Sequence, residues 1–381
     1  MSNNGILNNQ EKLDLAALIK ANDSDDCTED IRSKKQSSLI RTDVKQMVYL
    51  KQKYEIVACV DVNESSAKKM ADAFNCNAWT DLHDCIKGNN IDVGFVNVAS
   101  YLHFDIAKIL IENKVIPIVE KPPVLKLEHL NALKKLEDKH SIKCAFIFQN
   151  RLNPAIQYVK KTLEENSIGK IITASVVLRW CRYNDYYSDE WHGKWSLDGG
   201  VASQQGIHHI DAVQFLNGRL LEVTSFASTI INDLEAEDTI VAIGKFSNKS
   251  LCTFELTTGC RPEDIEASIS FTGDKGFIKI GGEALNYVTE HWQDVNGKIK
   301  PVKGIESYCE EVPSGYGLSH SRQLKIIADE YLSNKKTLTF ELDSVSHTMQ
   351  LIHALYRSNE DRDIVRIDDN LSSNKLGVNN G

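Results

Sequence analysis

The motif Val119-Glu120-Lys121-Pro122-Pro123 places a lysine where it could meet a ligand. It follows Ile116–Val119, a short apolar run that predicts a strand buried on both faces. Ligands of open α/β sheets bind beyond the carboxyl ends of the strands, so Lys121 is well placed to contact a charged group. The alternative is that Lys121 is an ordinary surface residue at the start of a loop.

A second candidate site lies in the segment Asp198–Asp211. Its two consecutive glycines allow a sharp turn or a close approach to a ligand. They lead into a predicted helix on which Gln204, His208 and Asp211 would share one face. A histidine that can take a proton near neutral pH, with a polar neighbour one turn earlier, suits a general base. The alternative is a helix cap whose histidines are buried in a core.

The elements that must position these motifs change in type along the chain. From about Leu39 to Asn150, apolar strands alternate with helices, which predicts a Rossmann-type α/β domain with a parallel sheet over residues 39–150. After Asn150 the strands alternate in polarity, which predicts an α+β domain with a mainly antiparallel sheet over residues 151–381. We expect two late helices, near Ser319–Leu332 and Ser344–Arg357, to pack back on the first domain.

Residues 1–38 differ from the rest of the chain. They are polar and rich in acids, and only Leu13–Ile19 predicts a short amphipathic helix. We therefore expect a poorly ordered or atypical segment, with the first strand of the parallel sheet and its glycine turn missing. The first glycine after Gly5 is Gly88.

Charge and cysteine usage exclude several classes of protein. The net charge of −9 repels phosphate backbones, so we expect no nucleic-acid partner. No apolar run is long enough for a membrane helix, and the N-terminus lacks the features of a secretory signal. Nine scattered cysteines without a C-x-x-C pair predict reduced thiols, no structural metal site and a cytoplasmic location.

Together the two motifs resemble the glucose–fructose oxidoreductase/inositol dehydrogenase family, often called Gfo/Idh/MocA. The resemblance runs from about Leu39 to Arg357, with Glu120-Lys121-Pro122 and Gly199–Asp211 as its markers. Shorter matches are Tyr101-Leu102-His103, Gln149-Asn150-Arg151 and His320-Ser321-Arg322-Gln323. The segment from Tyr186 to Gly200 is similar to the branch that handles sugars and nucleotide sugars.

The resemblance implies an oxidoreductase that moves a hydride between a carbinol carbon of a sugar or nucleotide sugar and NAD(P). Lys121 would contact the reacting hydroxyl and His208 would be the base, while Gln204 stands where family members often carry Asp or Asn. Cofactor binding would fall to Asp61, His103, Glu120 and Lys121, and substrate binding to Gln204, Arg179, Tyr187, Trp195 and His320. A homo-oligomer would form through the C-terminal sheet.

The aromatic residues and the arginines of the predicted substrate domain have two possible roles. Tyr187 and Trp195 offer flat faces on which a sugar ring or a base can stack. Arg179, like Arg182, can clamp a phosphate or carboxylate through two hydrogen bonds, which would favour a nucleotide-diphosphate sugar or a uronate. Alternatively, the aromatic residues close the domain interface and the arginines lie on the surface.

The choice of cofactor depends on Asp61, which ends the predicted strand Glu55–Asp61. An acid there accepts from the ribose 2′-hydroxyl and repels a 2′-phosphate, so NAD is favoured over NADP. The stretch Asp25–Ser38, however, has no G-x-G-x-x-G fingerprint, so we expect weaker NAD binding than in a relative that has one.

The sequence is compatible with three functions. The first is an NAD-dependent sugar dehydrogenase. The second is a catalytically impaired family member, retained as a sugar-binding or structural subunit or produced by a reading-frame lesion. The third is redox-assisted glycoside cleavage, which uses the same fold and cofactor.

Overall fold

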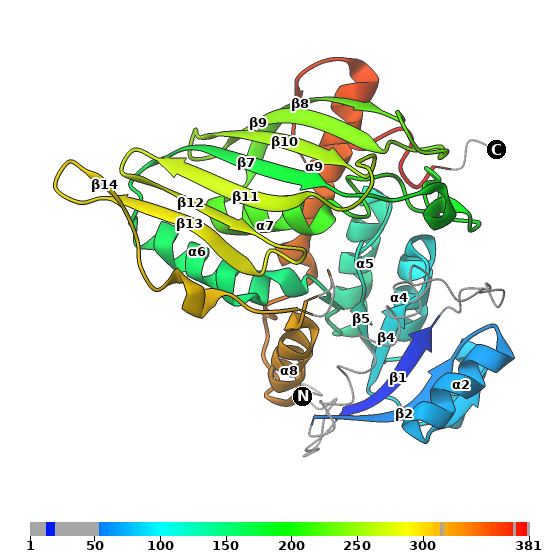
Figure 1. Ribbon diagram of the computed structural model, residues 1–381. Coiled ribbons are helices and arrows are strands. Elements are labelled where there is room, and N and C mark those ends of the chain that lie inside the picture. Colours follow the sequence, from blue (N-terminus) through cyan, green and yellow to red (C-terminus); the bar gives the residue numbers. More distant parts are fainter. Residues whose placement is uncertain (1–12, 20–52, 313–314, 316, 369–370, 379–381) are drawn as a thin grey trace. The chain divides into compact units, whose positions relative to one another are not determined.

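The computed structural model describes residues 13–19, 53–312, 315, 317–368 and 371–378 (Figure 1). The chain divides into two compact units. The first unit contains the described residues up to Pro123 together with residues 131–147 and 320–344. The second contains residues 124–130, the described residues of 148–319, and those from Val345 onward. None of the helices in these described ranges is long and apolar enough to cross a membrane.

The first unit contains a six-stranded parallel sheet in the order β3-β2-β1-β4-β5-β6. Its strands are β1 (Leu13–Ile19), β2 (Tyr54–Val60), β3 (Asn77–Trp79), β4 (Val93–Asn97), β5 (Ile116–Val119) and β6 (Ala145–Phe146). Its helices are α2 (Glu64–Phe74), α3 (Leu82–Gly88), η1 (Ser100–Leu102), α4 (His103–Glu112), most of α5 (Leu127–His140) and most of α8 (Ser319–Leu332). Every residue of β5 is buried, as a strand covered on both faces requires.

Strand β1 corrects the interpretation of the N-terminal segment. Residues Leu13–Ile19 form a central strand that pairs in parallel with β2 on one side and β4 on the other. The predictions of a helix at this place and of a missing first strand were therefore wrong. Leu and Ala have high helix propensity and the run does not alternate, so the local sequence gives no strand signal, and pairing on both edges decides the conformation. The rest of residues 1–38 lies outside the described residues.

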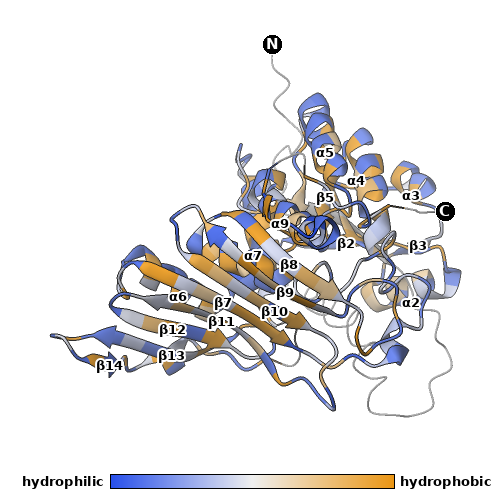
Figure 2. Cartoon of the chain, turned by 90° about the horizontal axis from the view of Figure 1, so that it is seen from above, coloured by the Kyte–Doolittle hydropathy of each residue, from blue (hydrophilic) through white to orange (hydrophobic). Residues whose placement is uncertain are grey.

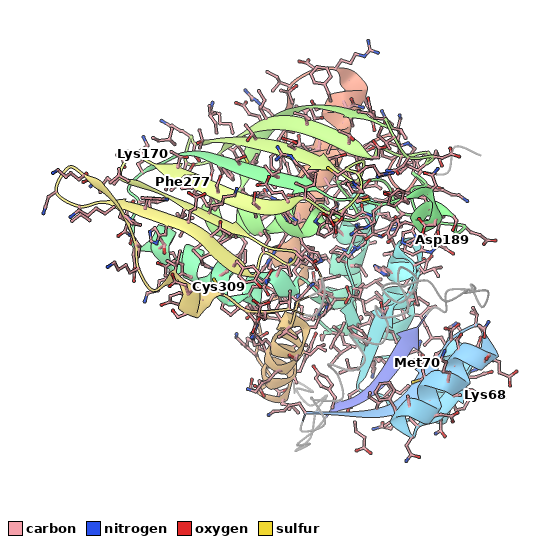
Figure 3. All side chains as sticks on the ribbon, viewed as in Figure 1. Lys68, Met70, Lys170, Asp189, Phe277 and Cys309 are labelled. Carbon is pink, nitrogen blue, oxygen red and sulfur yellow. The ribbon has the colours of Figure 1, made fainter. Side chains whose placement is uncertain are left out.

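Helix α2 fixes the end of β2, where Asp61 lies. Asn63 caps the helix by accepting a hydrogen bond from the backbone N–H of Ser66 at 3.1 Å. Met70 packs against a small core that contains Cys59 of β2, whereas Lys68 is exposed (Figure 3). The amphipathic helix thus anchors the carboxyl end of β2 against the sheet.

The second unit contains a nine-stranded sheet in the order β14-β13-β12-β11-β7-β10-β9-β8-β15. Its strands are β7 (Ile171–Arg179), β8 (Leu220–Ser228), β9 (Thr239–Phe246), β10 (Leu251–Thr257), β11 (Glu266–Gly273), β12 (Gly276–Gly281), β13 (Tyr287–Asp294), β14 (Ile299–Pro301) and β15 (Val365–Arg366). Helical segments of this unit are η2 (Gln149–Leu152), α6 (Pro154–Glu164), η3 (Asn184–Tyr187), α7 (Ile207–Asn217), η4 (Ile305–Tyr308) and most of α9 (Leu342–Asp361). All strand pairs are antiparallel except β7 with β10. The two sheets together confirm the predicted fold class.

The nine-stranded sheet has one covered and one open face. Helices α6 and α7 pack on one side of it (Figure 1). The strands alternate between buried and exposed residues, so the second face is open to solvent in the described structure. Figure 2 shows hydrophobic residues along the strands of this sheet. On the open face, Phe226 of β8 and Ile243 of β9 are 78% and 57% exposed.

Candidate functional site

The carboxyl end of β5 brings three of the predicted site residues together in the first unit. Glu120 is buried, and its Oε1 lies 3.6 Å from Nε2 of His320 at the start of α8. Its Oε2 accepts a hydrogen bond from the backbone N–H of Lys121 at 3.1 Å. Burial raises the pKa of Glu120, but the adjacent His320 and Lys121 outweigh burial and hold this pKa below its usual range. An ionised carboxylate therefore lies beside Lys121.

Helix α8 positions His320 although it is far along the chain from β5. The side chain of Gln323 donates to the carbonyl oxygen of Phe146 at 2.7 Å, and the hydroxyl of Tyr54 donates to the carbonyl oxygen of Leu324 at 2.8 Å. These bonds tie the helix to β6 and β2. His320 therefore reaches Glu120 through long-range packing.

His103 lies at the start of α4 and is buried. Its Nδ1 lies 2.7 Å from the carbonyl oxygen of Pro122 and its Nε2 3.1 Å from that of Val98. Burial lowers the pKa of His103 despite both carbonyls and the Glu120 charge. Both ring nitrogens thus face the backbone, and the residue links the end of β4 to the Lys121–Pro122 turn.

Asp61 follows β2 directly, as expected for the acid at the end of the second strand of a Rossmann sheet. It is 3% exposed, and its Oδ1 accepts from the backbone N–H of Asn63 at 2.8 Å. Its own N–H donates to the carbonyl oxygen of Trp79 at 3.1 Å. The backbone on both sides of the carboxylate is therefore fixed.

Gln204, a predicted site residue of the second unit, lies before α7 and not on it. Helix α7 begins at Ile207, and residues 201–206 form turns, so the predicted face shared by Gln204, His208 and Asp211 on one helix was wrong. Gly199 adopts a φ of +80°, which favours glycine and directs the chain into these turns. The amide of Gln204 donates to Oδ1 of the buried Asp198 at 2.6 Å. The contact of Gln204 with Asp198 was not predicted, although Asp198 directly precedes the glycine pair.

The two adjacent histidines of α7 occupy different environments. His208 is half-buried with its ring edge-on to Phe148 at 6.1 Å, whereas His209 is buried and edge-on to Trp180 at 6.2 Å. Burial lowers the pKa of His209 to about 4, so it does not take up a proton near neutral pH. The carboxylate of Asp211 forms an ion pair with the guanidinium of Arg151 at 2.6 Å.

The aromatic residues of the segment 186–195 are held within the second unit. The hydroxyl of Tyr187 lies 2.8 Å from that of Thr258, and its ring packs edge-on against Tyr186 at 5.0 Å. Trp195 packs edge-on against Tyr356 of α9 at 5.0 Å. Burial raises the pKa of Tyr187 to about 12, so its hydroxyl stays protonated.

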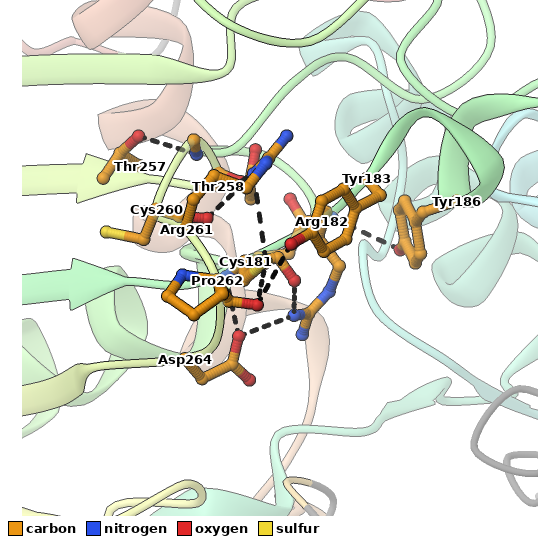
Figure 4. A network of polar contacts seen from close by, with 12 residues as sticks. Cys181, Arg182, Tyr183, Tyr186, Thr257, Thr258, Cys260, Arg261, Pro262 and Asp264 are labelled. Carbon is orange, nitrogen blue, oxygen red and sulfur yellow. Dashed lines mark hydrogen bonds and ion pairs between the residues drawn. The ribbon is translucent and has the colours of Figure 1, made fainter. Parts of the chain in front are cut away.

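The predicted role of Arg179 is not supported by its position. It lies on the open face of the sheet, away from α7, and its guanidinium binds Glu255 at 2.6 Å and Glu266 at 2.7 Å. Arg182 lies elsewhere, in a polar network with Asp264 at 3.0 Å (Figure 4). It also covers the ring of Trp180 at 4.8 Å. Of the two arginines, Arg182 is therefore associated with the aromatic residues near α7.

The fold and these residues define a two-domain α/β protein with a Rossmann-type sheet, and comparison with known families agrees. Residues 39–148 match the family model described as "Oxidoreductase family, NAD-binding Rossmann fold", and residues 156–279 match the GFO/IDH/MocA C-terminal domain. Together the two matches cover more than half of the chain. The protein belongs to the GFO/IDH/MocA oxidoreductase family, whose first domain is an NAD-binding Rossmann fold.

Individual relatives are distant in sequence. Dehydrogenase aclE of Aspergillus oryzae is 23% identical over 257 residues, which are 62% of this chain and 70% of the relative. The WlbA dehydrogenase from Bordetella pertussis, solved with NADH and UDP-GlcNAcA, gives a TM-score of 0.83 at 23% identity and covers 94% of this chain and 98% of its own. A levoglucosan dehydrogenase solved with NADH and L-sorbose gives a TM-score of 0.77 at 17% identity, and the match covers 93% of this chain and 99% of the dehydrogenase chain. At these identities the structural likeness shows the fold.

Proposed function

We propose that this protein is an NAD-dependent dehydrogenase that acts on a hydroxyl carbon of a sugar or nucleotide sugar. The observation that carries the proposal is the arrangement of Glu120, Lys121 and His320 at the carboxyl end of β5. This is the edge of a parallel sheet where ligands bind, and it belongs to an NAD-binding domain. The ligands named for the solved relatives, UDP-GlcNAcA and L-sorbose, support the substrate class.

His208 and Lys121 are the residues to which we assign the chemistry. His208 removes the hydroxyl proton, and Lys121 contacts the same hydroxyl and stabilises the charge that develops on its oxygen. His209 is unsuited as the base because burial lowers its pKa to about 4. His103 holds the turn beside Lys121 through the carbonyl oxygen of Pro122.

NAD would be held by the first unit. When bound, it supplies the hydride acceptor at C4 of its nicotinamide ring. The buried carboxylate of Asp61 at the end of β2 fits the ribose hydroxyls, and Glu120 and Lys121 lie at the end of β5. The sequence between β1 and β2 has no glycine, so the pyrophosphate lacks the usual glycine turn and we expect weak binding.

The substrate would contact the second unit beside α7. Gln204 orients a sugar hydroxyl, with Asp198 fixing its amide. Tyr187 and Trp195, which precede Gln204 in the same unit, would contact the sugar ring or the base. Arg182, which covers the ring of Trp180, offers a cation for a carboxylate or phosphate on the substrate. This assignment favours an anionic sugar, such as a uronate or a nucleotide sugar, over a neutral polyol.

A second candidate function is a catalytically impaired family member that binds sugar or serves as a structural subunit. The observation that favours it is the absence of glycine between Gly5 and Gly88. Without backbone N–H groups close to the pyrophosphate, the cofactor loses an important anchor.

Calorimetric titration with NADH distinguishes the two functions. We expect saturable binding of NADH, weaker binding of NADPH, and a smaller preference between them in Asp61→Ala. The exposed Asp72→Ala is the control and leaves both affinities unchanged. Absence of saturable NADH binding up to millimolar concentration would favour the structural subunit.

We further propose that the protein self-associates through the open face of the nine-stranded sheet. Phe226 of β8 pairs with Val241 of β9, and Ile243 follows on the same face. These side chains are more than half exposed, and a second copy would cover them.

A further inference from the structure

The turn that leads to Gln204 is held by two buried residues from distant parts of the second unit. Tyr356 of α9 accepts hydrogen bonds from the N–H groups of Ser203 at 3.2 Å and Gly200 at 3.4 Å. Glu237, which lies just before β9, accepts from the N–H of Ala202 at 2.9 Å through its side chain. Its carbonyl oxygen accepts from the N–H of Val201 at 3.0 Å.

Tyr356 and Glu237 thus accept hydrogen bonds from the backbone N–H groups of four consecutive residues, 200–203. They are also joined to each other, because the Tyr356 hydroxyl donates to Oε1 of Glu237 at 2.8 Å. Both side chains are at most 2% exposed. A buried network in which each hydrogen bond supports the next gives the turn one geometry.

The contact between the turn and Glu237 leaves no room for a side chain. A Cβ atom on Gly200 would lie 2.1 Å from both the carbonyl oxygen and a carboxylate oxygen of Glu237. The close approach of Glu237 therefore explains why the second residue of the pair is a glycine.

Backbone hydrogen bonds connect this turn to the residues of the site. The N–H of Gln204 donates to the carbonyl oxygen of Gly200 at 3.1 Å, and that of Gly206 donates to the carbonyl oxygen of Val201 at 2.7 Å. Gly206 is the N-cap of α7, which carries His208 in its first turn. The position of the turn therefore sets both Gln204 and the start of the helix.

We propose that Glu237 and Tyr356 are positioning residues that hold Gln204 and His208 in the geometry needed for proton removal from the substrate. This inference rests on the proposed dehydrogenase function. It adds to that function a pair of residues that touch neither substrate nor cofactor. Small displacements of catalytic groups reduce rates strongly, so loss of the pair lowers turnover.

The test compares Tyr356→Phe with Tyr331→Phe. Tyr331 is also buried, and its hydroxyl donates to the carbonyl oxygen of Lys143 in the first unit. We expect Tyr356→Phe to lower kcat by about 10- to 100-fold without changing the KM for NAD. Tyr331→Phe keeps kcat, although both variants lower the melting temperature. Unchanged kcat in Tyr356→Phe, or equal losses in the two variants, overturns the proposal.

Substitutions of Glu237 provide a second arm. Glu237→Gln keeps a carbonyl oxygen that can accept from Ala202 and Tyr356, so it loses less activity than Glu237→Ala. A double variant of Glu237→Ala with Tyr356→Phe is less impaired than the two single effects predict, because the residues act as one unit. Fully additive losses contradict this.

Amide hydrogen exchange separates a failure of this inference from a failure of the proposed function. In Tyr356→Phe the N–H groups of Gly200 and Ser203 exchange faster, whereas in Tyr331→Phe they do not. This result is expected even if the wild type oxidises no sugar, in which case only the proposed function fails. Unchanged exchange over the turn overturns the positioning role itself.

Discussion

At the scale of single residues, the candidate site consists of ionisable groups whose neighbours set their charge. Glu120 stays ionised beside His320 and Lys121, whereas His209 stays neutral because burial lowers its pKa to about 4. His209 faces the core, whereas the adjacent His208 on α7 is half-buried.

Lys121 gives the first prediction at this scale. Lys121→Ala lowers kcat by about 10²- to 10³-fold, because the developing oxyanion loses a cationic donor. The melting temperature stays close to that of the wild type. Steady-state kinetics and thermal unfolding measure both effects, with the half-exposed Lys126→Ala as control. Retained turnover in Lys121→Ala would exclude the assigned role.

Glu237 gives a prediction for the dependence of stability on pH. Burial raises its pKa from 4.5 to about 7; the N–H of Ala202 and the hydroxyl of Tyr356 oppose this, and Asp238 adds to it. Between pH 4.5 and 7 the native state therefore binds a proton that the unfolded chain releases. The free energy of unfolding of the wild type consequently falls as pH rises through this range, by about 3 kcal/mol from this group.

Glu237→Gln lacks an ionisable group and does not show this loss. Urea unfolding at several pH values should therefore show a stability difference, variant minus wild type, that rises from pH 4.5 to 7 and then levels off. The exposed Glu263→Gln serves as control. A difference that does not change with pH would show that Glu237 ionises in the native state as it does in the unfolded chain.

At the scale of elements, β1 is the piece on which the first unit depends. It pairs with β2 and β4 and so closes the gap in the middle of the parallel sheet. A chain without it would expose the edges of two strands.

Two truncations test this dependence. Removal of residues 1–12 leaves β1 in place and should leave thermal unfolding and amide exchange in β2 and β4 unchanged. Removal of residues 1–19 also deletes β1, and both strands should then exchange faster, with a lower melting temperature for the first unit. Equal behaviour of the two truncations would restore the interpretation of this segment as a tail.

Most other elements could be predicted from periodicity. Ser319–Leu332 is the helix that the spacing predicts, Ile116–Val119 is the predicted strand β5, and β2 lies within one residue of the predicted strand Glu55–Asp61. Leu13–Ile19 could not be recognised, because its composition favours a helix and only long-range pairing makes it a strand. The Asp198–Gln204 contact and the Tyr356–Glu237 pair were missed because packing, and not sequence spacing, brings these residues together.

At the scale of the whole molecule, the open sheet face is the feature that most requires a partner. Val241, Ile243 and Leu251 are each more than half exposed on neighbouring strands of this face. Polar residues normally occupy the solvent side of an antiparallel sheet.

Self-association through this face gives a prediction for particle mass. By light scattering after size-exclusion chromatography, the wild type should have a multiple of the 42.8 kDa chain mass. Val241→Lys combined with Ile243→Lys should shift the mass to that of a single chain, because two charges would otherwise be buried. Lys298→Glu, in the exposed turn between β13 and β14, is the control. A monomeric wild type would contradict this surface assignment.

Turnover of His208→Ala and His209→Ala tests the central claim most directly. Each protein is mixed with NAD and a panel of hexoses, uronates and nucleotide sugars, and NADH formation is followed by its absorbance. We predict NADH formation by the wild type with at least one anionic sugar, a loss of about 10²- to 10⁴-fold in His208→Ala, and a mild effect in His209→Ala. Equal losses in the two variants, or no NADH formation by the wild type with any member of the panel, would contradict the account.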